Sequence, residues 1–374
     1  MENTLFIVFL STFLYIVRIS FFIIGFIKEY KNIKTKKTSQ EHPYVSIIIP
    51  ARNEECNIKD NLESLTKINY PNDKFEILVV NDRSTDRTSF VVNEIMKLNK
   101  NIKLVNIEND AQKEHIPGKA GAVHIGVNNS KGDLIFVTDA DCQVQPNWLM
   151  KLTRLYNNNQ TGFVSSYTNV IGTRLFDKIQ AIEWIYMHTM GMGGVGMNIP
   201  LGCYGNNITF RKKFYLNFGG YKNISFSVTE DLALQMAFHK NKYEIHYLID
   251  PETIVDTKPC KNLKEYFAQH HRWARGGLNL GWKAVVFVLS SFTFWVGMFY
   301  FTILGYLYPV ILLLFIRMIG DFALLLSPLS ILNKKYLLKY IPIAVPFFLL
   351  VELVIPFFTL KKKVKWKNQV FTST

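Results

Sequence analysis

Apolar positions gather into long runs at both ends of the chain and into short runs between them. Residues 5–27 are almost wholly apolar, with Arg18 as their one charged residue. A helix needs about 20 apolar residues to cross the hydrocarbon core of a bilayer, so this run is long enough. Residues 285–329 and 341–360 are mostly apolar again, and the first of these runs has a break near 306–309. The pattern predicts one membrane-spanning helix before the central region and three after it.

The central region alternates short apolar runs with segments of helical period. Four runs rich in β-branched residues have the length of strands, and they cover residues 45–50, 76–82, 102–107 and 133–141. Helical patterns separate them, as at 57–68 and 84–98. Buried strands that alternate with helices form a parallel sheet covered by helices. The fold class is therefore predicted to be α/β, with a mostly parallel Rossmann-like sheet and flanking helices.

These patterns divide the chain into five expected parts. They are an N-terminal membrane anchor, a basic linker, an α/β domain, an amphipathic interfacial helix and a C-terminal membrane region with a basic tail, which cover residues 1–30, 31–43, 44–259, 260–283 and 284–374. The interfacial helix is expected because aromatic and basic residues are mixed there. Residues 190–200 are rich in glycine and methionine, and they are expected to form a mobile loop over an apolar acceptor or a plain membrane-facing connection.

The chain is basic, with 43 Lys and Arg against 29 Asp and Glu and a net charge of +14. The excess lies beside the apolar runs, at 28–37, 334–335 and 361–367. Basic flanks of this kind are typical of the cytoplasmic side of a membrane and of contact with anionic lipid. The sequence holds no nucleic-acid-binding module. The charge therefore indicates a membrane as partner and excludes nucleic acid.

The basic flanks do not settle the membrane topology. Glu2 precedes the first apolar run and basic residues follow it, which predicts a retained anchor whose C-terminal end is cytosolic. Three later crossings would place Lys361, Lys362 and Lys363 outside, against the positive-inside rule. A partly interfacial segment at 285–301 would instead place Lys334 outside. Because a charge at mid-bilayer is costly, Arg18 is expected to face another helix or to reach the membrane surface.

Acidic residues follow two of the predicted strands. Asp82 and Asp86 lie in V-V-N-D-R-S-T-D, and Asp139 and Asp141 lie in V-T-D-A-D. Parallel sheets bind ligands beyond the carboxyl ends of their strands. Hard cations prefer carboxylate oxygens and substrate phosphates, so Asp139 and Asp141 are candidate ligands of Mg²⁺ or Mn²⁺. The alternatives are a solvated loop or a cap of the next helix, and a helix cap is the favoured interpretation for Asp86.

Two further motifs carry candidate chemistry. Glu230 and Asp231 lie in T-E-D, where partial burial and a neighbouring acid would raise the pKa of a carboxyl group to suit a general base. The alternative is a helix start that Thr229 caps. The second motif is Q-H-H-R-W, in which Arg272 can bind a diphosphate with two parallel hydrogen bonds. The alternative there is a membrane-surface helix with aromatic anchors.

In this order, the four motifs resemble those of the membrane-bound family 2 glycosyltransferases, in the subgroup that carries Q-x-x-R-W. The resemblance covers about residues 43–280 and extends to enzymes of the ceramide glucosyltransferase and polysaccharide synthase types. It implies a GT-A fold and an inverting transfer of a sugar from a nucleotide-sugar to an acceptor hydroxyl. It also implies Asp231 as the catalytic base, with Glu230 as its supporting neighbour.

The resemblance assigns further residues to the donor. Asp82 is placed at the nucleobase, where a carboxylate can accept the N3–H of uracil, and Arg83 stands where many members have glycine. The donor-binding residues it implies are Pro50, Arg52, Glu54, Asp82, Lys119, Asp139, Gln269 and Arg272. Lys119 lies in P-G-K-A-G, a turn that opens a helix and suits a phosphate.

On the acceptor side, the resemblance implies Trp273 and Asn207. Trp273 closes the Q-x-x-R-W motif, and Asn207 lies in G-C-Y-G-N-N. The tail V-K-W-K-N at 364–368 is similar to the basic tail of lipid-directed members. The W-A-R-G-G sequence at 273–277 is instead shared with processive polysaccharide synthases.

The expected function is the transfer of a hexose or N-acetylhexosamine from a UDP-sugar to a membrane lipid. The enzyme is expected in a bacterial cytoplasmic membrane, with its catalytic domain in the cytosol. A processive polysaccharide synthase, of the poly-N-acetylglucosamine kind, is the alternative. A non-catalytic scaffold is disfavoured because all of the acidic motifs are present. A transporter is disfavoured because the chain has few membrane segments.

Overall fold

The computed structural model describes residues 2–36, 42–366 and 369–372, and it divides into two compact units. The first, which we call the helical unit, comprises residues 1–28, 173–201 and 260–374. The second, the α/β unit, comprises residues 29–172 and 202–259. Part of the expected basic linker, residues 37–41, lies outside the described residues, as do residues 367–368 of the basic tail.

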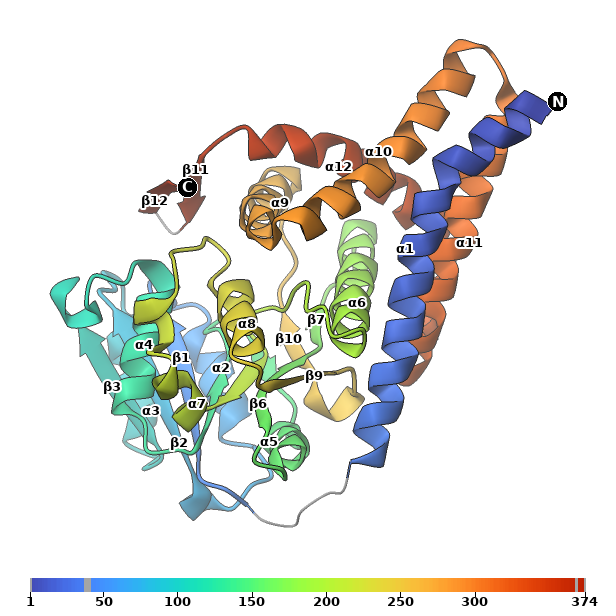
Figure 1. The fold of residues 1–374 in the computed structure, drawn as a ribbon. Helices are drawn as coiled ribbons and strands as arrows, with labels where there is room; N and C mark the ends of the chain where they lie inside the picture. Colours follow the sequence, from blue (N-terminus) through green and yellow to red (C-terminus); the bar gives the residue numbers. More distant parts are fainter. Residues whose placement is uncertain (1, 37–41, 367–368, 373–374) are drawn as a thin grey trace. The chain divides into compact units, whose positions relative to one another are not determined.

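The α/β unit is built on a seven-stranded sheet (Figure 1). The strands lie in the order β3-β2-β1-β4-β8-β6-β9. Their bounds are Ile102–Ile107, Phe75–Asp82, Val45–Ala51, Leu134–Val137, Ile208–Arg211, Thr161–Ser166 and Glu244–Leu248. Only β8 pairs antiparallel with its neighbours, so the sheet is mostly parallel. The first four strands match the four β-branched runs, which confirms the predicted fold class.

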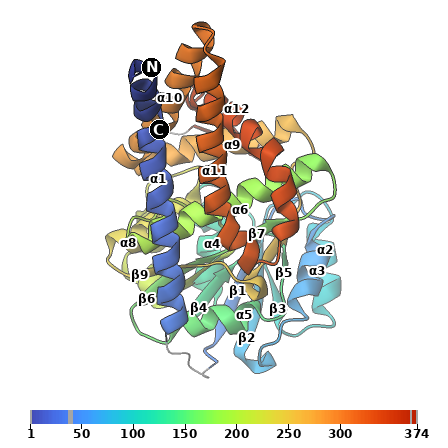
Figure 2. The same ribbon diagram turned by 90° about the vertical axis from the view of Figure 1, so that its right-hand side faces the viewer.

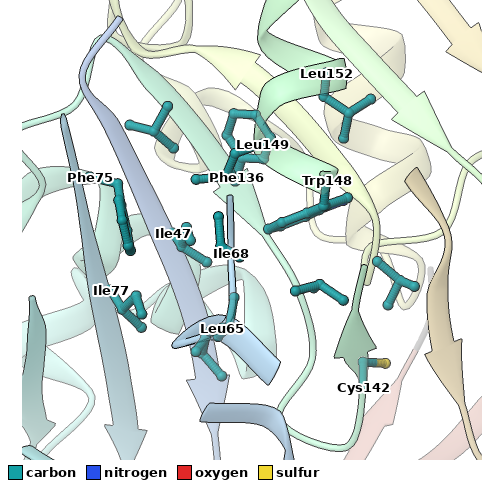
Figure 3. Packing of buried hydrophobic residues seen from close by; sticks show 14 of the residues in the cluster. Ile47, Leu65, Ile68, Phe75, Ile77, Phe136, Cys142, Trp148, Leu149 and Leu152 are labelled. Carbon is teal, nitrogen blue, oxygen red and sulfur yellow. The ribbon is translucent and has the colours of Figure 1, made fainter. Parts of the chain in front are cut away.

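Alternating side chains of the strands pack against helices on both faces of the sheet. The helices of this unit are α2 (Ile58–Leu65), α3 (Thr88–Met96), α4 (Gly118–Asn129), α5 (Trp148–Thr153), α7 (Lys212–Asn217) and α8 (Glu230–Lys240). Ile47, Leu65 and Phe136 belong to one core cluster, in which the ring centroids of Phe136 and Trp148 are 5.0 Å apart (Figure 3). Ile48 packs against α4 instead, where a Cβ atom on Gly126 would lie 2.5 Å from Ile48 Cγ2.

A smaller sheet in the α/β unit joins three short strands in the order β5-β10-β7. They are β5 (Gln143–Val144), β10 (Val255–Thr257) and β7 (Thr168–Val170). β5 follows directly from the loop that carries Asp139 and Asp141. Pairing of Val144 with Val255 anchors the far end of that loop.

The helical unit contains four helices that are long and apolar enough to cross a membrane, among the residues that the structure describes. They are α1 (Glu2–Thr35), α10 (Trp282–Ile303), α11 (Leu307–Ile331) and the helical stretch Lys335–Thr359, which includes α12 (Ile341–Thr359). α1 and α11 run side by side (Figures 1 and 2), and Tyr15 Oη donates to the carbonyl of Arg317 at 2.9 Å. One N-terminal and three C-terminal apolar helices agree with the sequence pattern.

Charged residues of these helices are buried against each other. Arg317 donates to Asp321 at 2.7 Å and to both carboxylate oxygens of Glu352 at 2.7 and 3.1 Å. Arg18 donates to the hydroxyl groups of Ser290 and Ser291 at 3.0 Å each. Arg18 therefore faces another helix, as the cost of a charge in lipid requires.

The helical unit also contains α6 (Leu175–Gly196), α9 (Leu263–Gly277) and a C-terminal hairpin of β11 (Lys363–Trp366) and β12 (Gln369–Thr372). α6 interrupts the continuous 44–259 domain that the sequence suggested, because residues 173–201 cluster with the helical unit. The mobile loop expected at 190–200 is wrong for residues 190–196, which are the last turns of α6. Gly193 lets α6 pack closely against α1, because a Cβ atom on it would lie 2.6 Å from the carbonyl oxygen of Phe22 in α1.

Candidate active site

The loops that follow β1 and β2 are tied to each other by side chains. Asn53 has a φ of 55°, and its side-chain oxygen accepts from the backbone of Thr85 at 2.8 Å. Asp86 accepts from the backbone N–H groups of Glu55 and Thr88 at 3.0 Å each. Asp86 therefore braces the start of α3 from one position before the N-cap, which is Arg87 and makes no side-chain capping bond. These contacts hold both loops at the carboxyl ends of adjacent parallel strands, where such sheets bind ligands.

Pro50 and Glu54 are both close to this strand end. Pro50 lies inside β1 and is in register with Val80 of β2. Glu54 is 7% exposed, and its carboxylate accepts from the side-chain amide of Asn57 at 2.8 Å. This bond ties one carboxylate oxygen of Glu54 to the residue that precedes α2. Its expected contact with the donor stays a prediction.

Asp82 ends β2 and lies among cations. Its Oδ1 accepts from Arg83 Nε at 2.8 Å, and its Oδ2 accepts from Lys113 Nζ at 3.0 Å. Arg52 Nη1 lies 3.9 Å from Oδ2. Arg83 adopts a φ of 55°, in the region that favours glycine. Arg83 Nε is paired with Asp82, and Arg83 Nη2 lies 3.0 Å from Asp110 Oδ1.

The loop after β4 carries Asp139 and Asp141. Asn61 of α2 is fully buried and donates to the backbone carbonyls of Asp139 and Cys142 at 3.1 and 2.7 Å. Asn61, which the sequence reasoning missed, therefore holds the loop in place. Asp141 keeps an exposed surface, yet the protein around its carboxyl group raises its pKa, and the neighbouring Asp139 adds to that rise.

Lys119, in the first turn of α4, lies between the loop that carries Asp139 and the acidic residue Glu230. Its Nζ lies 2.5 Å from Asp139 Oδ1 and 3.5 Å from Glu230 Oε1. Burial alone would lower the pKa of Lys119, but the carboxylates of Asp139 and Glu230 outweigh it and raise the pKa. Lys119 therefore stays charged. It lies between Asp139 and Glu230, which are 91 residues apart in the sequence (230 − 139).

Asp231 lies at the start of α8, where two backbone N–H groups hold its carboxylate. Gly205 N donates to Oδ2 at 2.7 Å and Leu232 N donates to Oδ1 at 2.8 Å. Burial, followed by the neighbouring charge of Glu230, raises the pKa of Asp231 to about 6, against the opposing effect of Lys119. A carboxylate with such a pKa is ionised at neutral pH and still basic enough to take a proton.

Gly205 is a second residue that the sequence reasoning did not assign. A Cβ atom there would lie 3.0 Å from Lys119 Nζ and 3.2 Å from Asp231 Cβ. Nothing local in the sequence indicated that the backbone N–H of Gly205 meets Asp231. Thr229 precedes α8 without a side-chain capping bond, so the acid pair is not explained by a capping box.

Asn207 is not available to an acceptor. It is fully buried, and its side-chain amide donates to the carbonyls of Tyr167 and Thr253 at 2.8 and 3.0 Å. Its side-chain oxygen accepts from Trp148 Nε1 at 3.0 Å. The expected acceptor role is therefore corrected to a structural one, because all of its hydrogen-bonding capacity but one lone pair is used inside the fold.

Gln269, Arg272 and Trp273 form a separate group on α9 in the helical unit. Gln269 Oε1 accepts from the thiol of Cys260 at 3.6 Å. The ring of Trp273 meets those of Trp184 and His270 edge-on, at centroid distances of 5.7 and 4.9 Å. Gln269, Arg272 and Trp273 are partly exposed, as residues that contact a substrate must be.

The carboxylates of Asp139 and Asp141 fit a hard divalent cation. Among the residues that the structure describes, no group of three or more His, Cys, Asp and Glu side chains is placed to hold a metal ion. Mg²⁺ commonly takes one or two carboxylates and completes its shell with water and substrate phosphates. Two carboxylates at a strand end therefore suit a cation that arrives with a diphosphate better than a permanent structural metal.

The mostly parallel sheet with its flanking helices has the architecture of a glycosyltransferase of the GT-A kind. The chain belongs to glycosyltransferase family 2. Residues 134–356, more than half of the chain, match the family described as glycosyl transferase family group 2, and residues 46–216 match glycosyl transferase family 2. The resemblance in the sequence motifs is thereby confirmed.

Three known proteins illustrate the relationship. A probable glycosyltransferase, YdaM, of Bacillus subtilis is 30% identical over 81% of this chain and 76% of its own length. A beta-monoglucosyldiacylglycerol synthase of Nostoc is 28% identical over 63% of this chain, but the match spans only 49% of that enzyme. A poly-beta-1,6-N-acetyl-D-glucosamine synthase of Staphylococcus epidermidis is 25% identical over 67% of this chain and 60% of its own length.

A solved structure shows the same fold. It is the mannosyltransferase PcManGT from Pyrobaculum calidifontis, in complex with GDP-Man and Mn²⁺. It superposes with a TM-score of 0.58 at 17% sequence identity, over 92% of this chain and 99% of that chain. The likeness therefore extends beyond the α/β unit to most of both chains.

Proposed function

We propose that the protein transfers a hexose or N-acetylhexosamine from a UDP-sugar to a hydroxyl group of a membrane lipid, with inversion at the sugar C1. The observation that carries the proposal is the grouping of Lys119, Asp139, Glu230 and Asp231 at one end of the sheet. It provides a base, a fixed positive charge and a cation ligand within one unit. The lipid acceptor is supported by the four apolar helices and by the beta-monoglucosyldiacylglycerol synthase among the relatives.

Asp231 is the proposed base. It takes the proton of the acceptor hydroxyl as that oxygen attacks C1 from the face opposite the diphosphate. The new oxygen–C1 bond forms as the bond from C1 to the diphosphate oxygen breaks, and the electron pair leaves with the diphosphate. Gly205 N and Leu232 N hold both carboxylate oxygens in place for the proton transfer. Such a base contributes a factor of about 10²–10⁴ in rate.

The remaining residues serve the donor and the acceptor. Asp82 would accept the N3–H of uracil, with Arg52 beside it and Pro50 near the nucleoside. Lys119 is the charge nearest to the phosphates, and Gln269 and Arg272 add donors for the diphosphate. Trp273 would wall the acceptor. A Mg²⁺ or Mn²⁺ ion held by Asp141 and Asp139 would act as a Lewis acid on the departing diphosphate.

The same residues also support an alternative, a processive polysaccharide synthase. The W-A-R-G-G sequence at 273–277 and the poly-N-acetylglucosamine synthase among the relatives favour it. A polymer path needs polar as well as aromatic lining, whereas the exposed side chains of α11 are apolar except for Tyr308, Ser327 and Ser330. The lipid acceptor is therefore the better supported of the two. In either case the enzyme is proposed to lie in a bacterial cytoplasmic membrane with the α/β unit in the cytosol.

The test uses the full chain in nanodiscs that contain diacylglycerol. UDP-glucose, UDP-galactose, UDP-N-acetylglucosamine and GDP-mannose are offered in turn with Mg²⁺ or Mn²⁺, and lipid products are identified by mass spectrometry. A low-mass glycolipid that is absent with Asp231→Asn and Asp141→Asn supports the proposal and identifies the sugar. A high-mass polymer establishes the alternative. Absence of any product and of nucleotide binding would refute both.

A further inference from the structure

Helix α9, which carries Gln269, Arg272 and Trp273, is held to α6 by one buried carboxylate. Glu183 Oε1 accepts from Tyr266 Oη at 2.6 Å and from His270 Nε2 at 2.9 Å. The side chains of Glu183 and His270 are 10% and 4% exposed. The rings of Tyr266 and His270 lie against each other, with centroids 3.9 Å apart. Two neighbouring turns of α9 therefore converge on a single oxygen of α6.

The bonding pattern makes His270 a cation. Its Nδ1 lies 2.8 Å from the backbone carbonyl of Tyr266, and its Nε2 faces the Glu183 carboxylate. A backbone carbonyl and a carboxylate are both acceptors, so this arrangement favours hydrogen on both ring nitrogens. Burial alone would lower the pKa of His270, but Glu183 and the Tyr266 carbonyl raise it. The contact between α6 and α9 is thus a buried ion pair, which is sensitive to the loss of either partner.

The rotation of α9 about its axis decides where its functional residues point. Successive residues of a helix are about 100° apart, so Tyr266 and His270 lie on one stripe. Gln269 lies beside that stripe, and Arg272 lies about 120° around the helix from Tyr266. Trp273 is on the stripe itself, one turn beyond His270, and its ring contacts both His270 and Trp184 of α6. A helix fixed at Tyr266 and His270 therefore has the directions of Gln269, Arg272 and Trp273 fixed as well.

Few other charged groups face this ion pair. α12 brings Phe347 to Tyr266, and its one titratable residue, Glu352, is bound to Arg317. β11 is also packed on α9, and its Lys363 is exposed. The thiol of Cys260 contacts Gln269, and its pKa is raised by burial and by Glu265 and Glu183. Among the residues that the structure describes, Glu183 is the one carboxylate with a hydrogen bond to His270.

We propose that Glu183 is a positioning residue for sugar transfer, which acts through His270 and Tyr266 to set the orientation of the Gln269-x-x-Arg272-Trp273 sequence. The inference rests on the proposed function of those three residues in binding donor and acceptor. Glu183 itself touches neither substrate. Its removal leaves the imidazolium buried without a counter-ion and frees α9 to rotate.

The test compares Glu183→Gln with wild type in nanodiscs, across a range of pH. The expected result is a fall in kcat of about tenfold or more at pH 8, with the Kd for uridine unchanged within about twofold, because uridine has no diphosphate for Gln269 and Arg272 to bind. The alkaline limit of activity moves down by about one pH unit or more, since an opposite charge at this distance raises a histidine pKa by about that amount. Tyr266→Phe, which keeps the ion pair and the ring contacts, leaves the alkaline limit in place.

Amide hydrogen exchange provides a readout that does not depend on activity. Glu183→Gln is expected to speed exchange in 263–277 while leaving 230–240 of α8 unchanged, and Glu94→Gln, an exposed carboxylate on α3, changes neither. Unchanged exchange in α9 would overturn the proposal, whatever the enzyme transfers. An unshifted alkaline limit in an active Glu183→Gln protein would also overturn it. A wild-type protein that transfers no sugar, although the amides of α9 are protected from exchange, would refute the proposed function instead.

Discussion

Asp231 combines a raised pKa with two backbone donors, and this combination suits a base that must be ionised near neutral pH. A lone buried carboxylate would be protonated too readily, whereas one exposed to water would be too weak a base. The N–H groups of Gly205 and Leu232 and the charge of Lys119 partly oppose the effect of burial and of Glu230, which leaves the pKa of Asp231 at about 6. The balance is set by neighbours from three parts of the chain.

Replacing Asp231 by Asn is expected to lower kcat by about 10²–10⁴-fold, because the acceptor proton loses its base. UDP binding is expected to stay within about twofold of wild type, because the contact is made in the transition state. The control is Asp133→Asn, an exposed carboxylate of the same unit. A kcat for Asp231→Asn within tenfold of wild type would assign the base elsewhere.

The pH dependence of wild type should follow the same group. A base must be ionised, so kcat is expected to fall as pH drops through about 6, the raised pKa of Asp231. The raised pKa also means that the folded protein binds the proton more tightly than the unfolded chain, so this group favours folding at acidic pH and opposes it above pH 6. Steady-state rates between pH 5 and 8 test the first point. A flat profile over that interval would contradict it.

Asp82 offers a second test at the scale of single residues. Asp82→Ala is expected to weaken UDP binding about 10–100-fold, the effect of losing a hydrogen bond to a charged group. Asp110 joins the same cluster of cations through Arg83, but its side chain is 61% exposed. Asp110→Ala is therefore the matched control and should change the Kd by less than about twofold. Equal effects in the two variants, by isothermal titration calorimetry, would remove Asp82 from the nucleobase site.

At the scale of elements, α6 determines how closely the helical unit packs. Gly193 and Gly25 face each other: a Cβ atom on Gly25 would lie 2.0 Å from the carbonyl oxygen of Gly193. The obstructing atoms are backbone, which cannot rotate away. Small residues at such positions let two helices approach closely. The sequence M-G-M-G-G-V-G is thus a packing surface, although its composition suggested mobility.

Gly193→Ala is accordingly expected to destabilise the protein by about 1–3 kcal/mol, the usual cost of overpacking. Gly277, at the end of α9, has nothing within 4 Å of the position of a Cβ atom. Gly277→Ala should therefore be neutral or stabilise by less than about 1 kcal/mol. Thermal unfolding in one detergent compares the two. Equal midpoints for both variants would contradict the close approach of α6 and α1.

At the scale of the whole molecule, contacts within the helical unit bear on the membrane topology, which the basic residues of the sequence left open. Arg275 of α9 donates to the carbonyl of Thr359 at 2.8 Å, and His271 Nε2 lies 2.9 Å from the carbonyl of Lys361. The end of α12 thus lies beside α9. A helix as rich in charge as α9 belongs at the membrane surface. Lys361, Lys362 and Lys363 are therefore expected at that surface, in agreement with the positive-inside rule. This placement requires that one of α10, α11 and the stretch Lys335–Thr359 does not cross the membrane.

This arrangement predicts the side from which the basic tail is reached. The tail and α9 are expected to face the cytosol together, so a cysteine at Lys362 should react with a membrane-impermeant thiol reagent in inside-out vesicles and stay unlabelled in intact cells. The reference is a cysteine at Lys264 in α9, in a background without the four native cysteines. Opposite labelling of the two positions would show that α12 carries the tail across the membrane.

Much of this protein follows from the sequence by itself. Its β-branched runs determined the first four strands, because buried parallel strands need apolar side chains on both faces. The long apolar runs determined the four candidate membrane helices, because a bilayer sets their length. The order of the acidic motifs was enough to indicate the family. Asp82 ends β2, and Asp139 and Asp141 follow β4.

Only the tertiary structure decided which residues meet. Asn207 has the right residue type for a substrate site, but partners distant in the sequence use its side chain inside the fold. Glu183 and His270 were unremarked positions in two helices 87 residues apart, and their pairing depends on how α6 and α9 pack. Local patterns report which face of an element is buried. They do not indicate which other element covers that face. The covering residues determine the charge, the hydrogen bonds and the role of each side chain.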